Sequence, residues 1–219
     1  MTKVSRKPKQ TRDNIASAPD TRGDKTRRQI KAVIAKLASK RDLADISLSD
    51  ICKGTKLTTG AVYFHFKGKD EAVEEMVVDE IESIYGRLLA VKHASFEEMA
   101  RAIIAQCTEY EQANGRRSRA IQLVINTRPR AYEAWIAARV PVIERLTELI
   151  ASARRKGELA EDASPFLALF ILNSIEDLSM DVFQWGNPTL RPFAEKPEDW
   201  IARQTALWSY AILAPIPSL

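Results

Sequence analysis

Cysteine, histidine and long apolar runs are all scarce in this sequence of 219 residues. The only cysteines, Cys52 and Cys107, lie far apart, so a reducing cytoplasm fits the chain better than a disulfide framework. The only histidines, His65 and His93, are too few for a well-supplied metal site. No run of about 18 apolar residues is present to span a membrane, and the charged segment 1–10 lacks the apolar stretch of a secretory signal. We therefore expect a cytoplasmic protein that needs no metal, no cofactor and no membrane.

Catalytic motifs are missing as well. The sequence contains no Gly-rich phosphate loop, no His-Glu-x-x-His, no paired cysteines and no nucleophile elbow. These absences argue against an enzyme. A helical enzyme and an adaptor that binds only protein stay open as alternatives to the function considered below.

The charge is distributed unevenly along the chain. Residues 1–69 contain 17 Lys and Arg against 6 Asp and Glu, whereas residues 70–219 contain 16 against 23. The net charge of +4 therefore conceals a basic N-terminal third and an acidic remainder. Such asymmetry favours a polyanionic partner for the first segment only, with a solvated basic tail as the plainer alternative.

Apolar residues recur at helical spacing along most of the chain, and no segment alternates convincingly with period two. The sequence therefore predicts an all-α protein. Pro141 is expected to bend or split the helix that contains it, and Asp24 or Thr26 to cap the first one. The expected helices span residues 24–39, 48–54, 59–65, 70–91, 96–113, 118–126, 130–156, 165–185 and 197–213.

Residues 47–66 carry the most informative pattern, which predicts two short helices joined by a tight turn. Ser47 suits the N-cap of the first helix and Thr58 that of the second. Leu57 anchors the turn, while Val62 and Phe66 fall on the side that faces the core. This is the arrangement of a helix-turn-helix, whose second helix enters the DNA major groove.

Three regions follow from these patterns. Residues 1–24 are expected to be a flexible basic arm, able to follow phosphates or enter the minor groove. Residues 25–69 are expected to form a DNA-binding domain of three helices, and residues 70–219 a larger helical bundle.

The same residues resemble the TetR family of bacterial transcriptional regulators. The resemblance rests on Thr26–Ile30, on Ser47–Phe66 and on Lys69-Asp70-Glu71. Within these segments, the positions that match the family pattern are Ile51, Leu57, Thr58, Gly60, Val62, Tyr63, His65, Phe66, Lys69 and Asp70. The detailed match covers about 45 residues and extends loosely to the C-terminus through the helix count and the Gly157–Pro165 stretch. It implies a homodimeric repressor that binds a palindromic double-stranded DNA operator and responds to a small-molecule effector.

Three residues depart from the family pattern. Lys56 stands where the turn usually has glycine, and a left-handed lysine there would cost roughly 1 kcal/mol or more. Cys52 replaces a common alanine, which is a tolerable apolar exchange. Arg41-Asp42 replace the glycine that usually ends the first helix, which leaves that helix end undefined.

Small polar residues, aromatics and cations are the candidate DNA contacts. A helix N-terminus and its hydroxyl can hold a phosphate, glycine lets the backbone approach closely, and Tyr63 lies one turn past Thr59. Tyr63 and Phe64 could also be core aromatics. The predicted DNA-binding residues are Arg27, Arg28, Ser47, Thr58, Thr59, Gly60, Ala61, Tyr63, His65 and Lys69.

The resemblance also implies sites in the larger bundle. An effector would lie between the middle helices, and the last two long helices would form the dimer as a four-helix bundle. The candidate pocket residues are Ile104, Cys107, Tyr110, Ile121, Ile125, Trp135 and Phe170. The candidate dimer residues are Phe166, Leu169, Leu172, Trp200, Leu207 and Trp208. An arginine cluster could meet an anionic ligand or DNA, or form a solvated face, and consists of Arg116, Arg117, Arg119, Arg128 and Arg130.

Overall fold

Helices make up the regular structure of the described chain. The computed structural model describes residues 21–156 and 165–213, and within these ranges it contains no strand. The all-α prediction is therefore confirmed. The elements are α1 (Arg22–Ala38), η1 (Leu43–Asp45), α2 (Leu48–Thr55), α3 (Thr59–His65), α4 (Lys69–Ala90), α5 (Phe96–Thr127), α6 (Pro129–Lys156), α7 (Pro165–Ser179), the π-helical η2 (Met180–Gln184), η3 (Arg191–Ala194) and α8 (Pro197–Ala211).

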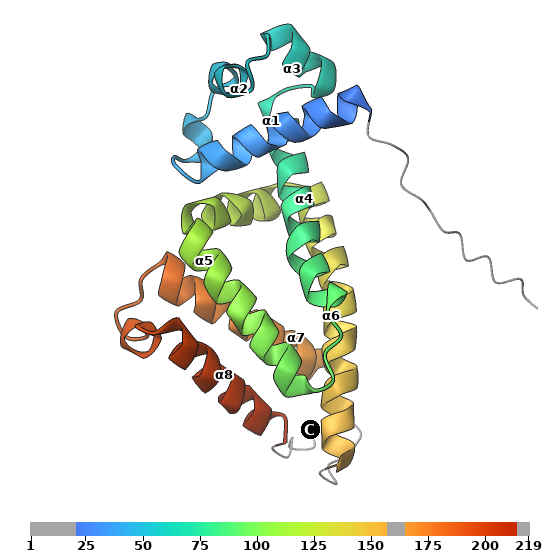
Figure 1. The fold of residues 1–219 in the computed structure, drawn as a ribbon, viewed down its shortest axis with the longest axis vertical. Helices are drawn as coiled ribbons and strands as arrows, with labels where there is room; N and C mark the ends of the chain where they lie inside the picture. The colour runs from blue at the N-terminus through green and yellow to red at the C-terminus, as the bar shows by residue number, and fades with distance from the viewer. Residues whose placement is uncertain (1–20, 157–164, 214–219) are drawn as a thin grey trace, which may run out of the picture.

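Helices α1, α2 and α3 form a small N-terminal domain at one end of the molecule (Figure 1). Its core joins side chains from all three helices, because Ile30 and Ile34 of α1, Ile51 of α2 and Val62 of α3 are all fully buried. Phe66, directly after α3, closes this core with 2% of its surface exposed. The three-helix domain expected from the sequence is present.

Side-chain caps fix where these helices begin. Ser47 caps α2 and Thr58 caps α3, as predicted. The predicted cap of α1 is wrong, because the N-cap is Thr21. Its hydroxyl accepts a hydrogen bond from the Asp24 N–H, and the Asp24 carboxylate accepts one from the Thr21 N–H, which completes a capping box. Helix α1 therefore starts at Arg22, inside the segment expected to belong to the arm. The rest of that expected arm, residues 1–20, lies outside the described residues.

The turn between α2 and α3 is built on a left-handed lysine. Lys56 has φ 59° and ψ 28° and is the only described non-glycine residue with positive φ. Its backbone N–H and that of Leu57 both donate to the carbonyl of Cys52, which ends α2 and starts the turn. The conformation expected for a glycine is thus kept here at the cost of Cβ strain.

The larger bundle contains α4 to α8, and α5 is its most irregular helix. The sequence predicts two helices, 96–113 and 118–126, separated at Asn114-Gly115. The structure instead has one helix from Phe96 to Thr127, with a non-helical residue at Asn114 (φ −135°, ψ 16°). The Asn-Gly pair therefore bends the chain without ending the helix, and the second half of α5 runs beneath α1 (Figure 1).

Pro141 lies inside α6, which continues unsplit from Pro129 to Lys156, so of the two expected effects of this proline, bending or splitting the helix, splitting does not occur. One further helix prediction needs correction. The helix that begins at Pro165 is α-helical only to Ser179, after which Met180–Gln184 adopt π-helical hydrogen bonding.

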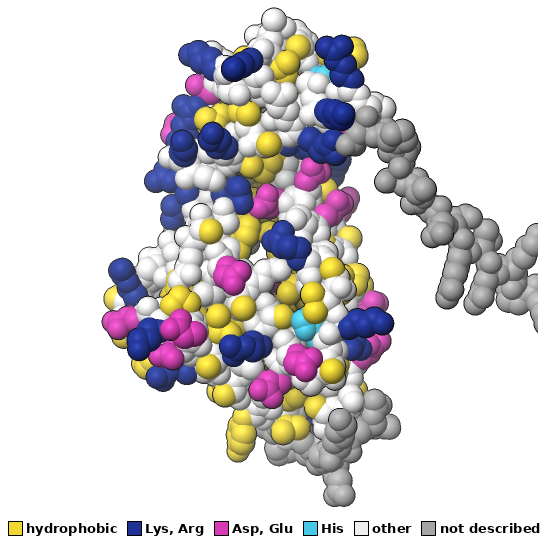
Figure 2. Space-filling model, viewed as in Figure 1, with side chains coloured by type: hydrophobic (Ala, Val, Ile, Leu, Met, Phe, Trp, Pro, Cys, Tyr) yellow, Lys and Arg dark blue, Asp and Glu magenta, His cyan; other side chains and the backbone are white. Residues whose placement is uncertain are grey.

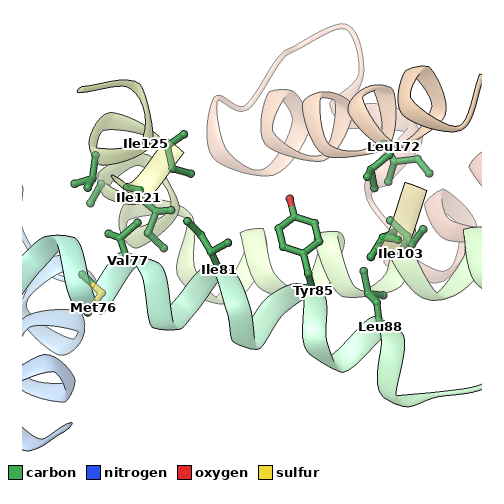
Figure 3. Close-up of a cluster of buried hydrophobic side chains, with 14 of the residues drawn as sticks. Met76, Val77, Ile81, Tyr85, Leu88, Ile103, Ile121, Ile125 and Leu172 are labelled. Atoms are coloured by element: carbon green, nitrogen blue, oxygen red, sulfur yellow. The ribbon is translucent and has the colours of Figure 1, made fainter. Parts of the chain in front are cut away.

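Helix α4 carries the central core of the bundle. Val77, Ile81, Tyr85 and Leu88 recur every three or four residues, which places them on one face. Figure 3 shows this face packed toward Ile121 and other apolar side chains of α5 and α7. Because α4 also packs against α1 and α6, it joins the N-terminal domain to the bundle.

Replacing Lys56 with glycine should stabilise the protein. Glycine adopts the left-handed conformation without Cβ strain, so K56G should raise the free energy of unfolding by roughly 1 kcal/mol. Urea denaturation followed by circular dichroism measures the change. The matched control K53G, at an exposed position inside α2, should lower it by about 1 kcal/mol. A destabilised K56G would contradict this account of the turn.

Replacing Gly54 with alanine should have the opposite effect, although alanine normally favours a helix. A Cβ at Gly54 would lie 2.5 Å from Cγ1 of Val33, so α1 and α2 would have to separate. We expect G54A to lower the free energy of unfolding by about 1–3 kcal/mol. The same change made in a V33A background should cost much less, since the clashing methyl is then absent. Equal costs in the two backgrounds would show that the contact is not responsible.

Candidate nucleic-acid interface and interior cavity

Helix α3 presents one face to the core and the other to solvent. Thr58 Oγ1 accepts a hydrogen bond from the Ala61 N–H at 3.2 Å, which fixes the start of the helix. Val62 is fully buried, whereas Thr59 and Gly60 are exposed. The first turn of α3 is therefore open to a partner.

Glycine at position 60 is not required by the packing of the protein. A Cβ built at Gly60 would meet no atom within 4 Å. Its φ is not positive either, since Gly186 is the only described glycine with that conformation. The absence of a side chain leaves the backbone of the first turn of α3 directly accessible.

Two aromatic side chains lie on the exposed face of α3. Tyr63 is 54% exposed and Phe64 is 85% exposed, so neither belongs to the core. The sequence analysis did not select Phe64. Its exposure could have been inferred, because Val62 and Phe66 both point inward and position 64 lies half a turn from each.

Ser47 is exposed but its hydroxyl is engaged. It donates to Asp50 Oδ2 at 2.6 Å, and it accepts from the Asp50 N–H at 3.1 Å. These hydrogen bonds and the Arg41 guanidinium, 3.0 Å away, lower the pKa of Asp50. The Ser47 hydroxyl thus acts first as a helix cap. Another predicted DNA-binding residue, Ala61 of α3, is only half-exposed.

Two cations that were predicted to contact phosphates, Arg27 and Lys69, form hydrogen bonds with other parts of the protein. Arg27 donates to the carbonyl of His65, pairs with Glu75, and lies with its guanidinium carbon 4.4 Å from the centre of the Phe66 ring. Lys69 Nζ donates to the carbonyl of Leu43 at 3.0 Å. These cations hold α1, α3 and α4 together, which is a bracing role that the sequence analysis did not anticipate.

Other cations of the N-terminal domain face solvent. Figure 2 shows Lys and Arg side chains gathered over this domain, with Asp and Glu concentrated further down the molecule. Arg28 of the predicted set is exposed, while His65 is half-buried. Further exposed Lys and Arg residues are Arg22, Lys25, Lys36, Lys40, Lys53, Lys56 and Lys67.

An interior cavity of about 90 Å³ lies between α4, α5, α6 and α7. Five of the candidate pocket residues line it, namely Cys107, Tyr110, Ile121, Ile125 and Trp135. Two do not: Ile104 is fully buried elsewhere, and Phe170 is 51% exposed at the outer surface. Helix periodicity gives the buried side of each helix, but not which buried residues border an empty space.

Buried carboxylates surround the cavity. Glu176 accepts a hydrogen bond from Tyr85 Oη at 2.7 Å and pairs with Arg139 at 3.1 Å. Burial raises the pKa of Glu176, and burial raises the pKa of Tyr85 and of the Cys107 thiol. Cys107 is therefore an unreactive thiol at neutral pH.

A second ion pair between an arginine and a glutamate lies beside the cavity. Arg117 pairs with Glu80 at 3.0 Å, and Tyr110 Oη donates to the same carboxylate at 3.2 Å. The pKa of Tyr110 is raised, chiefly by burial.

The arginine cluster is partly a solvated face, because Arg116, Arg128 and Arg130 are exposed, and each of its members also has a partner within the protein. Four members form ion pairs, in which Arg116 meets Asp42, Arg117 meets Glu80, Arg128 meets Asp70 and Arg130 meets Glu75.

The fifth member, Arg119, donates to the carbonyl of Gln184 and lies over the Trp185 ring. The Arg116–Asp42 pair links α5 to the segment after α1, so the cluster ties the bundle to the N-terminal domain.

The candidate dimer residues divide between surface and core. Phe166, Leu169 and Leu207 are 72%, 36% and 59% exposed, and Trp208 is half-buried. Leu172 and Trp200 are buried within the protomer at 0% and 5% exposure, so they cannot contribute to an interface. They lie on the inner sides of α7 and α8 because both helices pack inward on one face and expose apolar residues on the other.

Residues 21–156 and 165–213 show neither a metal site nor a membrane-spanning helix. No group of three or more His, Cys, Asp or Glu side chains is arranged to hold a metal ion there. No helix in these ranges is long and apolar enough to cross a membrane.

Comparisons with known proteins agree with this architecture. Residues 30–76 match the family described as bacterial regulatory proteins, tetR family. No curated protein sequence matches the chain.

Solved structures match over nearly the whole chain. Salmonella enterica GusR is 16% identical with a TM-score of 0.66, covering 89% of this chain and 98% of its own. A regulatory protein in the tetR family from Rhodococcus RHA1 is 17% identical with a TM-score of 0.65, covering 89% and 99%. The regulator FadR from Bacillus subtilis, solved in complex with stearoyl-CoA, is 14% identical with a TM-score of 0.61, covering 87% and 99%.

These matches cover the helix-turn-helix by sequence and the bundle by structure. Residues 30–76 form the N-terminal domain of the tetR family of bacterial regulatory proteins, and the chain has the fold of TetR-family transcriptional regulators.

Proposed function

We propose that the protein is a ligand-responsive transcriptional repressor that binds a palindromic operator as a homodimer. The observation that carries the proposal is the outward face of α3, where Thr59 and Gly60 are exposed and Tyr63 and Phe64 project into solvent. A short helix with an open first turn, on a domain rich in exposed cations, fits the major groove of DNA.

Contacts within the groove follow from the chemistry of each side chain. Thr59 can hydrogen-bond to a base edge, and Tyr63, one turn later, can reach a phosphate through its hydroxyl. Gly60 lets the helix approach without a side chain between backbone and DNA. Among the cations, exposed residues such as Lys53 and Lys56 suit phosphates better than Arg27 and Lys69, whose side chains hold the domain together.

The dimer is proposed to form through the outer sides of α7 and α8. Phe166, Phe170 and Leu207 expose large apolar surface there, and Tyr210 is 79% exposed. Contiguous exposed apolar surface of this kind is typical of an interaction site. Pairing two copies would set two α3 helices roughly 34 Å apart, one turn of DNA, and would require a palindromic operator.

The effector is proposed to occupy the cavity bounded by Tyr85, Tyr110 and Trp135. FadR from Bacillus subtilis, which has the same fold, was solved in complex with stearoyl-CoA. The Arg117–Glu80 pair beside the cavity and the neighbouring Arg116–Asp42 pair connect α5 to α4 and to the N-terminal domain. A ligand that shifts α5 would therefore change the orientation of α3, and with it the affinity for DNA.

A salt titration of duplex binding distinguishes this function from a helical enzyme or a protein-binding adaptor. A regulator that neutralises phosphates loses affinity steeply as salt rises, because counterions are released on binding. The alternatives predict weak, sequence-independent binding or none. A cytoplasmic location follows from the proposed function.

Replacing Thr59 and Tyr63 with alanine should abolish specific DNA binding. Both side chains are exposed, so the double variant should keep its helicity and its oligomeric state. Fluorescence anisotropy with an operator selected from random duplexes should show at least about thirtyfold weaker binding, since a base contact and a phosphate contact of roughly 1 kcal/mol or more each are lost.

The matched control removes an exposed threonine and tyrosine from the bundle, as T127A with Y132A, and should bind normally. Undiminished operator binding by the α3 variant would refute the assignment of α3 as the recognition helix.

Phe64 should contact a thymine methyl group in the operator. Apolar side chains read this methyl in the major groove, and Phe64 is the most exposed apolar side chain of α3. Replacing the contacted thymine with uracil should weaken wild-type binding about fivefold, the value of roughly one buried methyl group. F64A should bind the thymine and uracil duplexes equally. If no single uracil substitution affects the wild type more than F64A, Phe64 does not read a methyl group.

A further inference from the structure

The charged residues that line the cavity all carry the same sign. Among the described residues around it, Glu111 and Glu176 are the only ionisable side chains other than Cys107 and the two tyrosines, and no Lys, Arg or His is among them. The two arginines associated with the cavity, Arg117 and Arg139, pair with carboxylates from behind its wall. An anionic ligand would meet negative charge with no cation to receive it.

Glu111 differs from the other two carboxylates in its partners. Glu176 has Arg139 at 3.1 Å and Glu80 has Arg117 at 3.0 Å. Glu111 accepts one hydrogen bond at Oε1, from Ser118 Oγ at 2.6 Å. Its Oε2 is buried without a partner, and the residue is only 7% exposed.

An unpartnered buried carboxylate oxygen is energetically unfavourable unless something fills the position. Burial raises the pKa of Glu111, whereas Ser118 and the more distant Arg119 lower it. A donor that carries positive charge would both complete the hydrogen bonding and favour the ionised carboxylate.

The size and walls of the cavity limit what that donor can belong to. A volume of about 90 Å³ has room for several water-sized groups, at roughly 10–15 Å³ each. The walls are apolar where Ile81, Ile121 and Ile125 line them, and Figure 3 shows these side chains close together between α4 and α5. A short hydrocarbon group with one cationic end matches the apolar walls and the carboxylate of Glu111.

We propose that this cavity binds a small aliphatic amine in its ammonium form, with the ammonium group paired with the Glu111 carboxylate and the alkyl group against the isoleucines. This inference rests on the proposed function only for its regulatory consequence.

That consequence follows from the position of Glu111 on α5. The Glu111–Ser118 hydrogen bond spans the non-helical residue Asn114, so a ligand held by Glu111 acts on the bend of the helix. The segment just beyond the bend carries Arg116 and Arg117, which pair with Asp42 and Glu80.

Three probes of nearly equal size and different charge test the inference, namely n-butylammonium, 1-butanol and butyrate at neutral pH. Isothermal titration calorimetry and thermal shift of the full chain should show that n-butylammonium binds best and that butyrate fails to bind. The substitution E111Q keeps the size of the side chain but removes its charge, and should weaken n-butylammonium binding about tenfold through loss of a charge-assisted hydrogen bond. The matched control E109Q changes an exposed glutamate outside the cavity on the same helix and should leave binding unchanged.

Binding of butyrate or 1-butanol as tight as that of n-butylammonium would overturn the inference, and so would unchanged binding by E111Q. If E111Q does not fold, the ranking of the three probes on the wild-type protein decides the question. Operator binding measured without any probe tests the proposed function separately: a protein that binds DNA but ranks the probes differently refutes only the amine.

Discussion

The burial of one face of α4 is the constraint on which the rest of the structure depends. Val77, Ile81, Tyr85 and Leu88 bury this face against α5 and α7, and the same helix packs on α1 at its N-terminal end and on α6 along its length. A single rigid element thus belongs to both the N-terminal domain and the bundle. Any change that moves α4 or α5 within the bundle must move the domain that carries α3, because the core between them is closely packed.

Ion pairs also connect the N-terminal domain to the bundle. Arg27 of α1 donates to the carbonyl of His65 at the end of α3 and pairs with Glu75 of α4. It therefore holds these three helices together. Arg116 reaches Asp42 from the far side of the junction. Two of the cations that the sequence suggests for DNA, Arg27 and Lys69, therefore also hold elements of the protein together.

The cavity between α4, α5, α6 and α7 combines apolar walls with carboxylates that are mostly paired with arginines. Arginines balance Glu80 and Glu176, which leaves Glu111 as the carboxylate whose hydrogen bonding is incomplete. Its hydrogen bond with Ser118 spans the bend at Asn114. The likeness to FadR extends to the fold.

The sequence by itself determined the all-α fold, the helices of the N-terminal domain, the caps at Ser47 and Thr58 and the outward first turn of α3. These features are local, because helical periodicity and capping depend on residues within a few positions of one another. Only the tertiary structure decided that Arg27 and Lys69 have internal partners, that Leu172 and Trp200 belong to the protomer core, and that Ile104 lies away from the cavity. Those outcomes depend on which helices meet and at what angle, and pairings between residues far apart in the chain leave no periodic trace in the sequence.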